Sequence, residues 1–209
     1  AIDQNLHFAQ WFKVIEKMGY DWHKNLVHVP FGLVSLESGK LSTRKGNVVL
    51  MEDLLSEAVK KTAAIIEEKN PDLPNKEEVA KEVGIGAVIF DDLYNGRIKD
   101  IVFSWKKMLS FEGETGPYVQ YTNARACSVL RKAGEEAEGN VDFSLLTDDV
   151  TVEVIKLLAS FNDKVKDAAE RYEPSVVSRY LVDLAQAFNK FYHDNSILNA
   201  EENTRKARL

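Results

Sequence analysis

Apolar residues recur at helical spacing through most of the 209-residue chain. The first stripe predicts a helix that begins near Leu6 and stops at Gly19, a typical helix terminator. A second stripe predicts a helix over about residues 51–69. The segment NPDLPN, residues 70–75, is the clearest linker, and helical periodicity resumes over residues 76–95.

The second half of the chain continues as helices. Gly84 and Gly86 either weaken the middle of their helix or allow a close helix crossing. A turn over residues 112–116 comes before Pro117, which suits the first position of a new helix. One long helix is predicted from the stripe Val154, Leu157, Leu158, Phe161, Val165 and Ala168. After a break at residues 173–175, another is predicted from Val177, Leu181, Leu184, Phe188 and Phe191.

The first fifty residues have a different pattern. The segment NLVHVPFGLVSL, residues 25–36, is rich in valine and leucine and is interrupted by Pro30 and Gly32. This composition favours one or two short strands with a bend. The chain is therefore predicted to be mostly α, with a short α/β part followed by a helical bundle.

Composition excludes several kinds of protein. Apolar residues make up 44% of the chain, enough for a folded core, and no run reaches the length of a membrane span. One cysteine and four scattered histidines give no internal disulfide and no metal-ligand spacing. The net charge of −6 argues weakly against nucleic acid, although a local cationic cluster matters more than the total. We expect a cytoplasmic protein without a structural metal.

The segment GKLSTRKGNVV, residues 39–49, is the most informative stretch. Gly39 and Gly46 permit unusual backbone angles around a group of cations and hydroxyls. Such a loop can surround a polyphosphate, and the candidates are Lys40, Ser42, Thr43, Arg44 and Lys45. The spacing of a P-loop is absent, and the alternative on this stretch alone is a solvated hairpin tip.

The same stretch resembles the second signature loop of class I aminoacyl-tRNA synthetases, in the K-M-S-T-R-K-G form of the arginyl-tRNA synthetases. Leu41 stands where methionine is common, and Thr43 stands where other class I enzymes carry a second lysine. The segments DQNLHFAQWFKVIEKMGY and HVPFGLV are also similar to that family. So are two later segments, which resemble its anticodon-binding helices: residues 103–134 and 172–198.

This resemblance implies ATP-dependent activation of arginine and its transfer to tRNA(Arg), with Mg²⁺ supplied with the nucleotide. Lys40 is expected to meet the β- and γ-phosphates. The neighbouring Ser42, Thr43 and Lys45 would assist it through hydrogen bonds and charge. Because Thr43 replaces the second lysine, either Arg44 or Lys45 is left to neutralise the phosphates.

Three further positions match the ATP side of the family's pocket. Gln4 can both donate to and accept from ribose hydroxyls, and His7 lies one helical turn later. Val34 resembles a position whose backbone meets adenine. For each there is a plain structural alternative: a helix-start glutamine, a histidine with a structural hydrogen bond, and a core strand residue.

A possible tRNA-binding face follows Pro117. Tyr118, Tyr121 and Arg125 lie at i, i+3 and i+7, on one side of the predicted helix. Aromatic planes and an arginine suit the bases of an unwound anticodon loop, although such a trio also occurs in helix packing. A smaller basic and aromatic group would meet a tRNA stem or form a solvated edge: Arg97, Lys99, Trp105, Lys106 and Lys107.

The resemblance also sets an expected domain organisation. Residues 1–53 would be the C-terminal part of a Rossmann-like catalytic domain. Residues 54–209 would be the all-α anticodon-binding domain, with the bundle proper from about residue 111 and a truncated last helix. The family's first signature, HIGH, has no counterpart in the sequence. We therefore expect a C-terminal fragment of a monomeric enzyme that cannot aminoacylate tRNA alone.

Three other interpretations remain open from the sequence. The first is a fragment of another class I synthetase, such as the cysteinyl or methionyl enzyme. The STRKG variant and the PYVQY helix argue against it. The second is a stand-alone helical module that binds tRNA or a protein partner. The third is a helical scaffold whose basic loop is only solvated.

Overall fold

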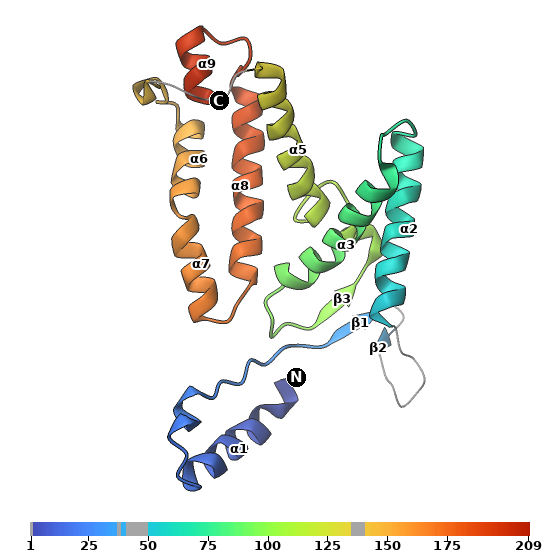
Figure 1. The fold of residues 1–209 in the computed structure, drawn as a ribbon, viewed down its shortest axis with the longest axis vertical. Coiled ribbons are helices and arrows are strands. Elements are labelled where there is room, and N and C mark those ends of the chain that lie inside the picture. The colour runs from blue at the N-terminus through green and yellow to red at the C-terminus, as the bar shows by residue number, and fades with distance from the viewer. Residues whose placement is uncertain (1, 37–38, 41–49, 135–140) are drawn as a thin grey trace.

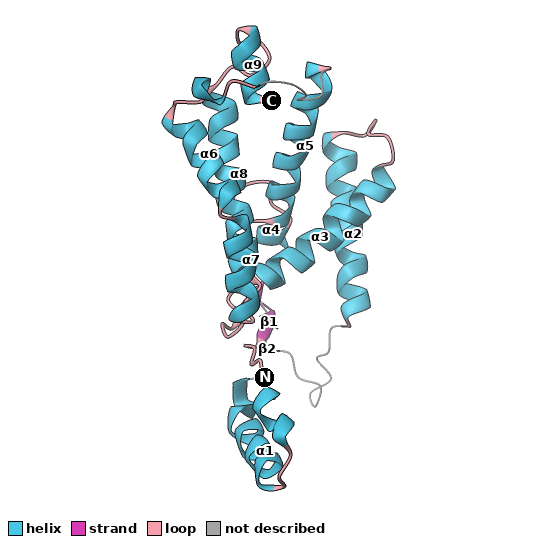
Figure 2. Cartoon of the chain, turned by 60° about the vertical axis from the view of Figure 1, so that its left-hand side comes forward, coloured by secondary structure: helices cyan, strands magenta, loops and turns pink. Residues whose placement is uncertain are grey.

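The structure is a computed structural model that describes residues 2–36, 39–40, 50–134 and 141–209. Helices dominate it, and a small sheet lies between the first helix and the others (Figures 1 and 2). This arrangement confirms the predicted fold class, a short α/β part followed by a helical bundle. In the described ranges, no helix has both the length and the apolar character that a membrane crossing requires.

The N-terminal arm carries the first predicted helix. It contains the 3-10 turn η1 (Ile2–Gln4), helix α1 (Asn5–Lys17) and the 3-10 turn η2 (Asp21–Asn25). Gly19 adopts a φ of +85° just beyond α1, as expected for a helix terminator. In both views α1 is set apart from the other helices (Figures 1 and 2). Much of its apolar stripe is therefore exposed, including Leu6, Val14 and Met18.

Within the described residues, the sheet has three short strands: β1 (Val34–Leu36), β2 (Gly39–Lys40) and β3 (Ile101–Phe103). β1 is central, antiparallel to β2 and parallel to β3. Just before β1, a Cβ added to Gly32 would lie 2.2 Å from the carbonyl oxygen of Lys99. Only glycine fits this close approach of two backbones.

Helices α2 (Met51–Lys69) and α3 (Lys76–Tyr94) pack against each other and match the predicted ranges. Short helix α4 (Trp105–Met108) adds to their shared core. That core is formed by Ala58, Ala87, Val88, Met108 and Leu109. A Cβ added to Gly84 would lie 2.9 Å from backbone atoms of Ala58. Gly84 therefore permits a close helix crossing, one of the two roles predicted for it.

Replacing Gly84 by alanine should lower the free energy of unfolding relative to a Gly86→Ala variant by about 1–3 kcal/mol, because the new methyl group overpacks the α2–α3 crossing. Both substitutions gain the same helix propensity, about 1 kcal/mol. A Cβ at Gly86 would meet only the flexible end of the Gln120 side chain. Chemical denaturation of both variants measures the difference, and equal stabilities would contradict the close crossing.

The remaining helices form the bundle: α5 (Gly116–Ala133), α6 (Asp149–Ala159), α7 (Phe161–Glu170), α8 (Ser175–Asp194) and α9 (Glu202–Arg208). A 3-10 turn, η4 (Phe143–Leu145), precedes α6. Helix α8 contacts α5, α6 and α7, and so holds the bundle together. Val129, Phe191 and Ile197 form a buried cluster within it. The N-cap of α5 is Thr115, which puts Pro117 at the second helical position, one residue later than predicted.

One long helix was predicted across residues 154–168, and this prediction is wrong. The structure has two helices, α6 and α7, with a break at Ser160. The Ser160 hydroxyl donates to the carbonyl oxygen of Leu157 at 2.8 Å, and its amide is shared between the carbonyls of Lys156 and Leu157. Serine side chains that bond back to the preceding turn commonly bend or interrupt helices.

Candidate functional site

The predicted phosphate loop follows β2. Lys40 pairs with Ser35 across the antiparallel β1–β2 ladder. The other predicted phosphate ligands lie outside the described residues: Ser42, Thr43, Arg44 and Lys45. The pairing of β1 with β2 therefore places the backbone of Lys40 directly beside β1.

The predicted nucleotide-side residues lie on the arm and on β1. Gln4 is the last residue of η1, and His7 is exposed in the first turn of α1 with its ring edge against Phe8, 5.6 Å between centroids. Val34 begins β1 opposite Ile101 and is 43% exposed. The amide of Ile2 donates to the carbonyl oxygen of Phe31 at 3.0 Å. This bond holds the start of the arm beside the segment that leads into β1.

The predicted tRNA-binding residues meet around Asn189 of α8. The Asn189 amide nitrogen donates to the hydroxyl oxygens of Tyr118 and Thr122, both at 2.9 Å. Its oxygen accepts a hydrogen bond from Nη1 of Arg125. The Thr122 hydroxyl in turn donates to the carbonyl oxygen of Tyr118 at 2.9 Å. One amide side chain thus fixes three residues of α5.

Arg125 lies between two tyrosine rings. Its guanidinium carbon is 4.9 Å from the ring centroid of Tyr121 and 5.0 Å from that of Tyr192 in α8. Nη2 also donates to the Tyr121 hydroxyl at 3.2 Å. Both hydrogen-bond acceptors are neutral groups, so its positive charge remains available to an anionic or polar ligand. We call this group the Asn189 cluster: Tyr118, Tyr121, Thr122, Arg125, Asn189 and Tyr192.

Two cavities flank the cluster. One, of about 310 Å³, lies between α5 and the end of α8, and Tyr121, Arg125 and Tyr192 line it. The other, of about 760 Å³, lies between α5 and the α2–α3 pair. Tyr121 and Arg125 line this cavity as well, so both residues can reach a ligand from either side. An unstacked base needs such a concave space beside an aromatic plane.

Sequence reasoning predicted the α5 side of this cluster and missed the α8 side. Asn189 and Tyr192 each follow an apolar stripe residue of α8, at the polar edge of its buried face. That edge position was visible in the sequence. The sequence did not show which helix this edge faces, because Asn189 lies 64 residues beyond its partner Arg125.

The predicted turn before α5 is held by its own hydroxyl groups. The Thr115 hydroxyl donates to the carbonyl oxygen of Ser110 at 2.6 Å and accepts from the amide of Tyr118 at 3.2 Å. Burial, and then a hydrogen bond with Glu114 of this turn, raises the pKa of Tyr94 to about 12.

Arg97 was grouped with residues that would meet a tRNA stem or form a solvated edge, but its side chain is only 27% exposed and bonds within the protein. Its guanidinium donates to the carbonyl oxygens of Pro30 and Tyr172. Trp105 of the same predicted group lies under Lys61, whose Nζ is 5.6 Å from the ring centroid. In the part of the chain that the structure describes, no cluster of three or more histidine, cysteine or carboxylate side chains is arranged to hold a metal ion.

Comparison with known families places both halves of the chain. The family tRNA synthetases class I (R), catalytic domain, matches residues 1–105. The chain belongs to the arginyl class I tRNA synthetases. The DALR anticodon binding domain matches residues 119–209, which include the whole Asn189 cluster except Tyr118. The family assignment made from the signature loop is thereby confirmed, whereas the expected domain boundary at residues 53 and 54 remains a prediction.

Similar proteins in this family are considerably longer than the chain. The arginine–tRNA ligase of Halothermothrix orenii is 60% identical over 99% of this chain, which covers 36% of that protein. The arginine–tRNA ligase of Clostridioides difficile is 58% identical with the same coverage, 99% and 36%. The chain thus spans about 36% of the length of these curated relatives.

Solved structures agree with the fold. The arginyl-tRNA synthetase of Thermus thermophilus superposes with a TM-score of 0.81 at 39% identity, over 89% of this chain and 32% of its own. The arginyl-tRNA synthetase of Plasmodium falciparum superposes with a TM-score of 0.78, over 99% of this chain and 35% of its own. Its identity of 23% supports the fold alone.

Proposed function

We propose that the chain forms part of an arginine–tRNA ligase, which activates arginine with ATP and transfers it to the 3′ end of tRNA(Arg). In this proposal the chain supplies the signature loop and the anticodon-binding helices. The observation that carries it is the Tyr121–Arg125–Tyr192 stack on helices that match an anticodon-binding family. Relatives named arginine–tRNA ligase, up to 60% identical, support the choice of amino acid.

The signature loop would act on ATP by charge and position. When the arginine carboxylate attacks the α-phosphate, negative charge accumulates on the phosphoryl oxygens, so fixed cations and N–H donors lower the barrier. We assign Lys40 to the β- and γ-phosphates. Ser42, Thr43 and Lys45 would donate hydrogen bonds, and either Arg44 or Lys45 would replace the second lysine. ATP would bring Mg²⁺ bound to its own phosphates.

The arm and β1 would hold the rest of the nucleotide. Gln4 is assigned to the ribose hydroxyls, since its amide can donate and accept. His7 is assigned to the adenylate side and the backbone of Val34 to the adenine edge. The bond between Ile2 and Phe31 supports this assignment because it fixes the start of the arm near the segment before β1.

The Asn189 cluster would read the anticodon. Tyr121 is 49% exposed and can stack on an unpaired base, as aromatic side chains do in single-strand recognition. The guanidinium of Arg125 can hydrogen-bond a base edge or a phosphate. Tyr118 contributes by fixing Asn189, and through it the orientation of Arg125.

The catalytic and anticodon-binding parts would belong to one enzyme. Residues 1–53 would belong to the catalytic domain and residues 54–209 to the anticodon-binding domain. The whole enzyme would act as a monomer in the cytoplasm. Its substrates would be arginine, ATP and tRNA(Arg).

Binding of the purified chain to tRNA(Arg) tests the anticodon assignment. We expect binding to be about 5- to 150-fold tighter than to the same tRNA with a changed middle anticodon base, since each base-edge contact contributes about 1–3 kcal/mol. Titrations at two salt concentrations separate base reading from phosphate attraction, because only the latter weakens steeply with salt. The preference for the unchanged anticodon should survive at the higher salt.

A binding result without base preference would contradict the anticodon assignment. Equal affinities for both tRNAs, falling together as salt rises, would show that the chain attracts phosphates without reading bases. The assignment of Tyr121 and Arg125 to the anticodon would then be wrong.

A further inference from the structure

Arg97 joins two parts of the chain that lie far apart in sequence. It follows α3, within the range that matches the catalytic domain family. Its amide donates to Oε1 of Glu173 at 3.2 Å, in the corner between α7 and α8. Its carbonyl oxygen accepts from the amide of Gly32 at 2.6 Å, two residues before β1. The backbone of one residue thus contacts both the segment that leads into β1 and the corner of the bundle.

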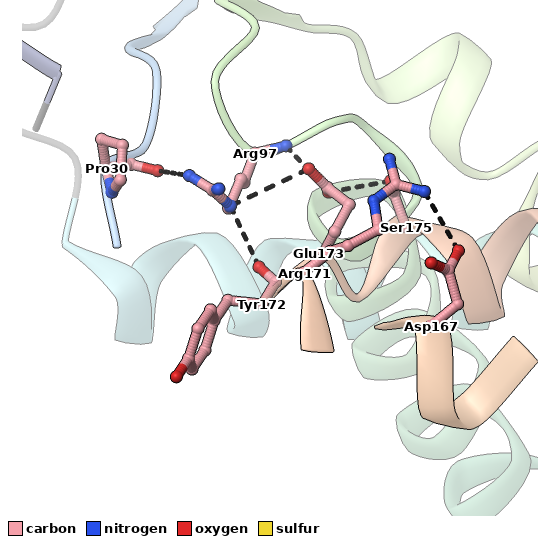
Figure 3. A network of polar contacts seen from close by, with 7 residues as sticks. All are labelled: Pro30, Arg97, Asp167, Arg171, Tyr172, Glu173 and Ser175. Carbon is pink, nitrogen blue, oxygen red and sulfur yellow. Dashed lines mark hydrogen bonds and ion pairs between the residues drawn. The ribbon is translucent and has the colours of Figure 1, made fainter. Parts of the chain in front are cut away.

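The side chain of Arg97 connects the same two parts of the chain as its backbone does. Nη1 donates to the carbonyl oxygen of Pro30 at 2.7 Å, and Nε donates to the carbonyl oxygen of Tyr172 at 3.0 Å. Nε is also 3.9 Å from Oε2 of Glu173. Figure 3 shows the guanidinium between Pro30 on one side and the Tyr172–Glu173 corner on the other. The planar fork of arginine suits this double contact, which a single ammonium group cannot reproduce.

The Tyr172–Glu173 end of this connection is fixed by burial and by further contacts. Only 14% of the Glu173 side chain and 27% of the Arg97 side chain are exposed, so solvent screens the pair less than it screens a surface pair. The Ser175 hydroxyl donates to Oε1 of Glu173 at 2.8 Å. Tyr172 adopts a left-handed φ of +52°, a conformation that a non-glycine residue keeps only where its surroundings fix it.

A second arginine in the same corner provides a contrast. Arg171 donates to Asp167 at 3.0 Å, one turn earlier in α7, and its side chain is 60% exposed. That pair joins the C-cap residue of α7 to the last turn of the same helix (Figure 3). Arg97, by contrast, connects the segment before β1 with the bundle.

We propose that Arg97 is a positioning residue through which the anticodon-binding bundle holds the strand that leads to the signature loop. This inference rests on the proposed function. The corner at residues 172–175 opens α8, and α8 also carries Asn189 and Tyr192. At the other end, Pro30 and Gly32 lie in the segment that leads into β1, and β1 pairs with Lys40. A ligand that fixes α8 would therefore also restrain the segment before β1, through the contacts of Ser175 with Glu173, of Glu173 with Arg97 and of Arg97 with Gly32.

Amide hydrogen exchange of the chain, with and without saturating tRNA(Arg), tests this coupling. The readout is the peptide over residues 31–36, which contains the Gly32 amide bonded to Arg97. We expect tRNA to slow its exchange about fivefold or more, the usual lower range for coupled sites. In an Arg97→Met variant the tRNA-dependent slowing should disappear, although exchange in the free chain also becomes faster.

Two further variants separate coupling from general damage. Arg97→Lys keeps the charge and the aliphatic stem but loses the fork, so it should lose the coupling even if Arg97→Met does not fold. Arg171→Met removes the same side chain from the same corner and should keep the coupling. All folded variants should bind tRNA(Arg) within about threefold of the unchanged chain, because Arg97 is not part of the Asn189 cluster.

The outcomes are distinct. Slowing that persists unchanged in Arg97→Lys and Arg97→Met overturns the proposal, and so does its absence in an unchanged chain that binds tRNA. Loss of slowing in Arg171→Met as well would assign it to general loosening of the corner and would also overturn the proposal. If the unchanged chain fails to bind tRNA(Arg), the binding curve itself shows that the proposed function has failed, and this inference falls with it.

Discussion

Replacing Arg125 by alanine is expected to weaken binding of the chain to tRNA(Arg) by about 10- to 100-fold, in line with about 1–3 kcal/mol for one stacked base or bidentate contact. The guanidinium lies between two tyrosine rings and donates only to neutral partners in its described hydrogen bonds. Removing it takes away both the charge and the planar group that lies over the two rings. Preference for the unchanged middle anticodon base should fall in parallel with affinity.

Two matched variants decide whether charge or shape matters at this position. Arg125→Lys keeps the positive charge but cannot offer a planar group to the rings, so base discrimination should still fall. Arg131→Ala removes the same charge from an exposed position in the last turn of α5. It should cost at most about threefold in affinity and leave discrimination intact, as expected for a phosphate contact. Equal losses from Arg125→Ala and Arg131→Ala would contradict base reading by Arg125.

Local patterns in the sequence were enough for the long helices. The apolar stripe of residues 51–69 and the restart at residue 76 gave the bounds of α2 and α3 within one residue. Helices follow from short-range periodicity and from terminators such as the prolines of the linker. Ser160 interrupts the helix between α6 and α7, but the apolar stripe continues across it. The sequence pattern therefore gave no sign of the break.

Contacts between distant segments could not be predicted in the same way. Strand β3 is only three residues long and pairs in parallel with β1, so that Val34 meets Ile101. Parallel pairing of such separated segments leaves no turn signature for the sequence to reveal. Arg97 was visible as a basic residue, but its carbonyl and carboxylate partners come from residues 30, 172 and 173.

The signature loop shows another limit of prediction from the sequence. Its chemistry was inferred from residue types and from a family resemblance, and most of its side chains lie outside the described residues. What the structure adds is the frame around it: β1 beside β2, and Gly32 against the backbone of Lys99. That frame explains why the segment before the loop needs a glycine, a feature that the sequence alone presented only as a bend.

Replacing Asn189 by alanine is expected to lower the free energy of unfolding by about 2.5–6 kcal/mol, because each lost hydrogen bond contributes about 0.5–1.5 kcal/mol and one to a charged group about 1.5–3 kcal/mol. The amide bonds Tyr118, Thr122 and Arg125 at once, and Thr122 is only 6% exposed. Chemical denaturation measures the loss. Gln186→Ala, an exposed amide one turn earlier in α8, should change stability by less than about 0.5 kcal/mol.

An Asn189→Asp variant then separates stability from recognition. A carboxylate still accepts from Arg125, and the Tyr118 hydroxyl can reverse its role and donate, so most of the lost stability should be kept. The new negative charge, however, neutralises the guanidinium that would face the tRNA. Affinity for tRNA(Arg) should therefore fall about tenfold or more, as for the loss of one base contact. If Asn189→Asp binds tRNA(Arg) as tightly as the unchanged chain, the charge of Arg125 does not act on the tRNA, and the cluster serves only to join α5 to α8.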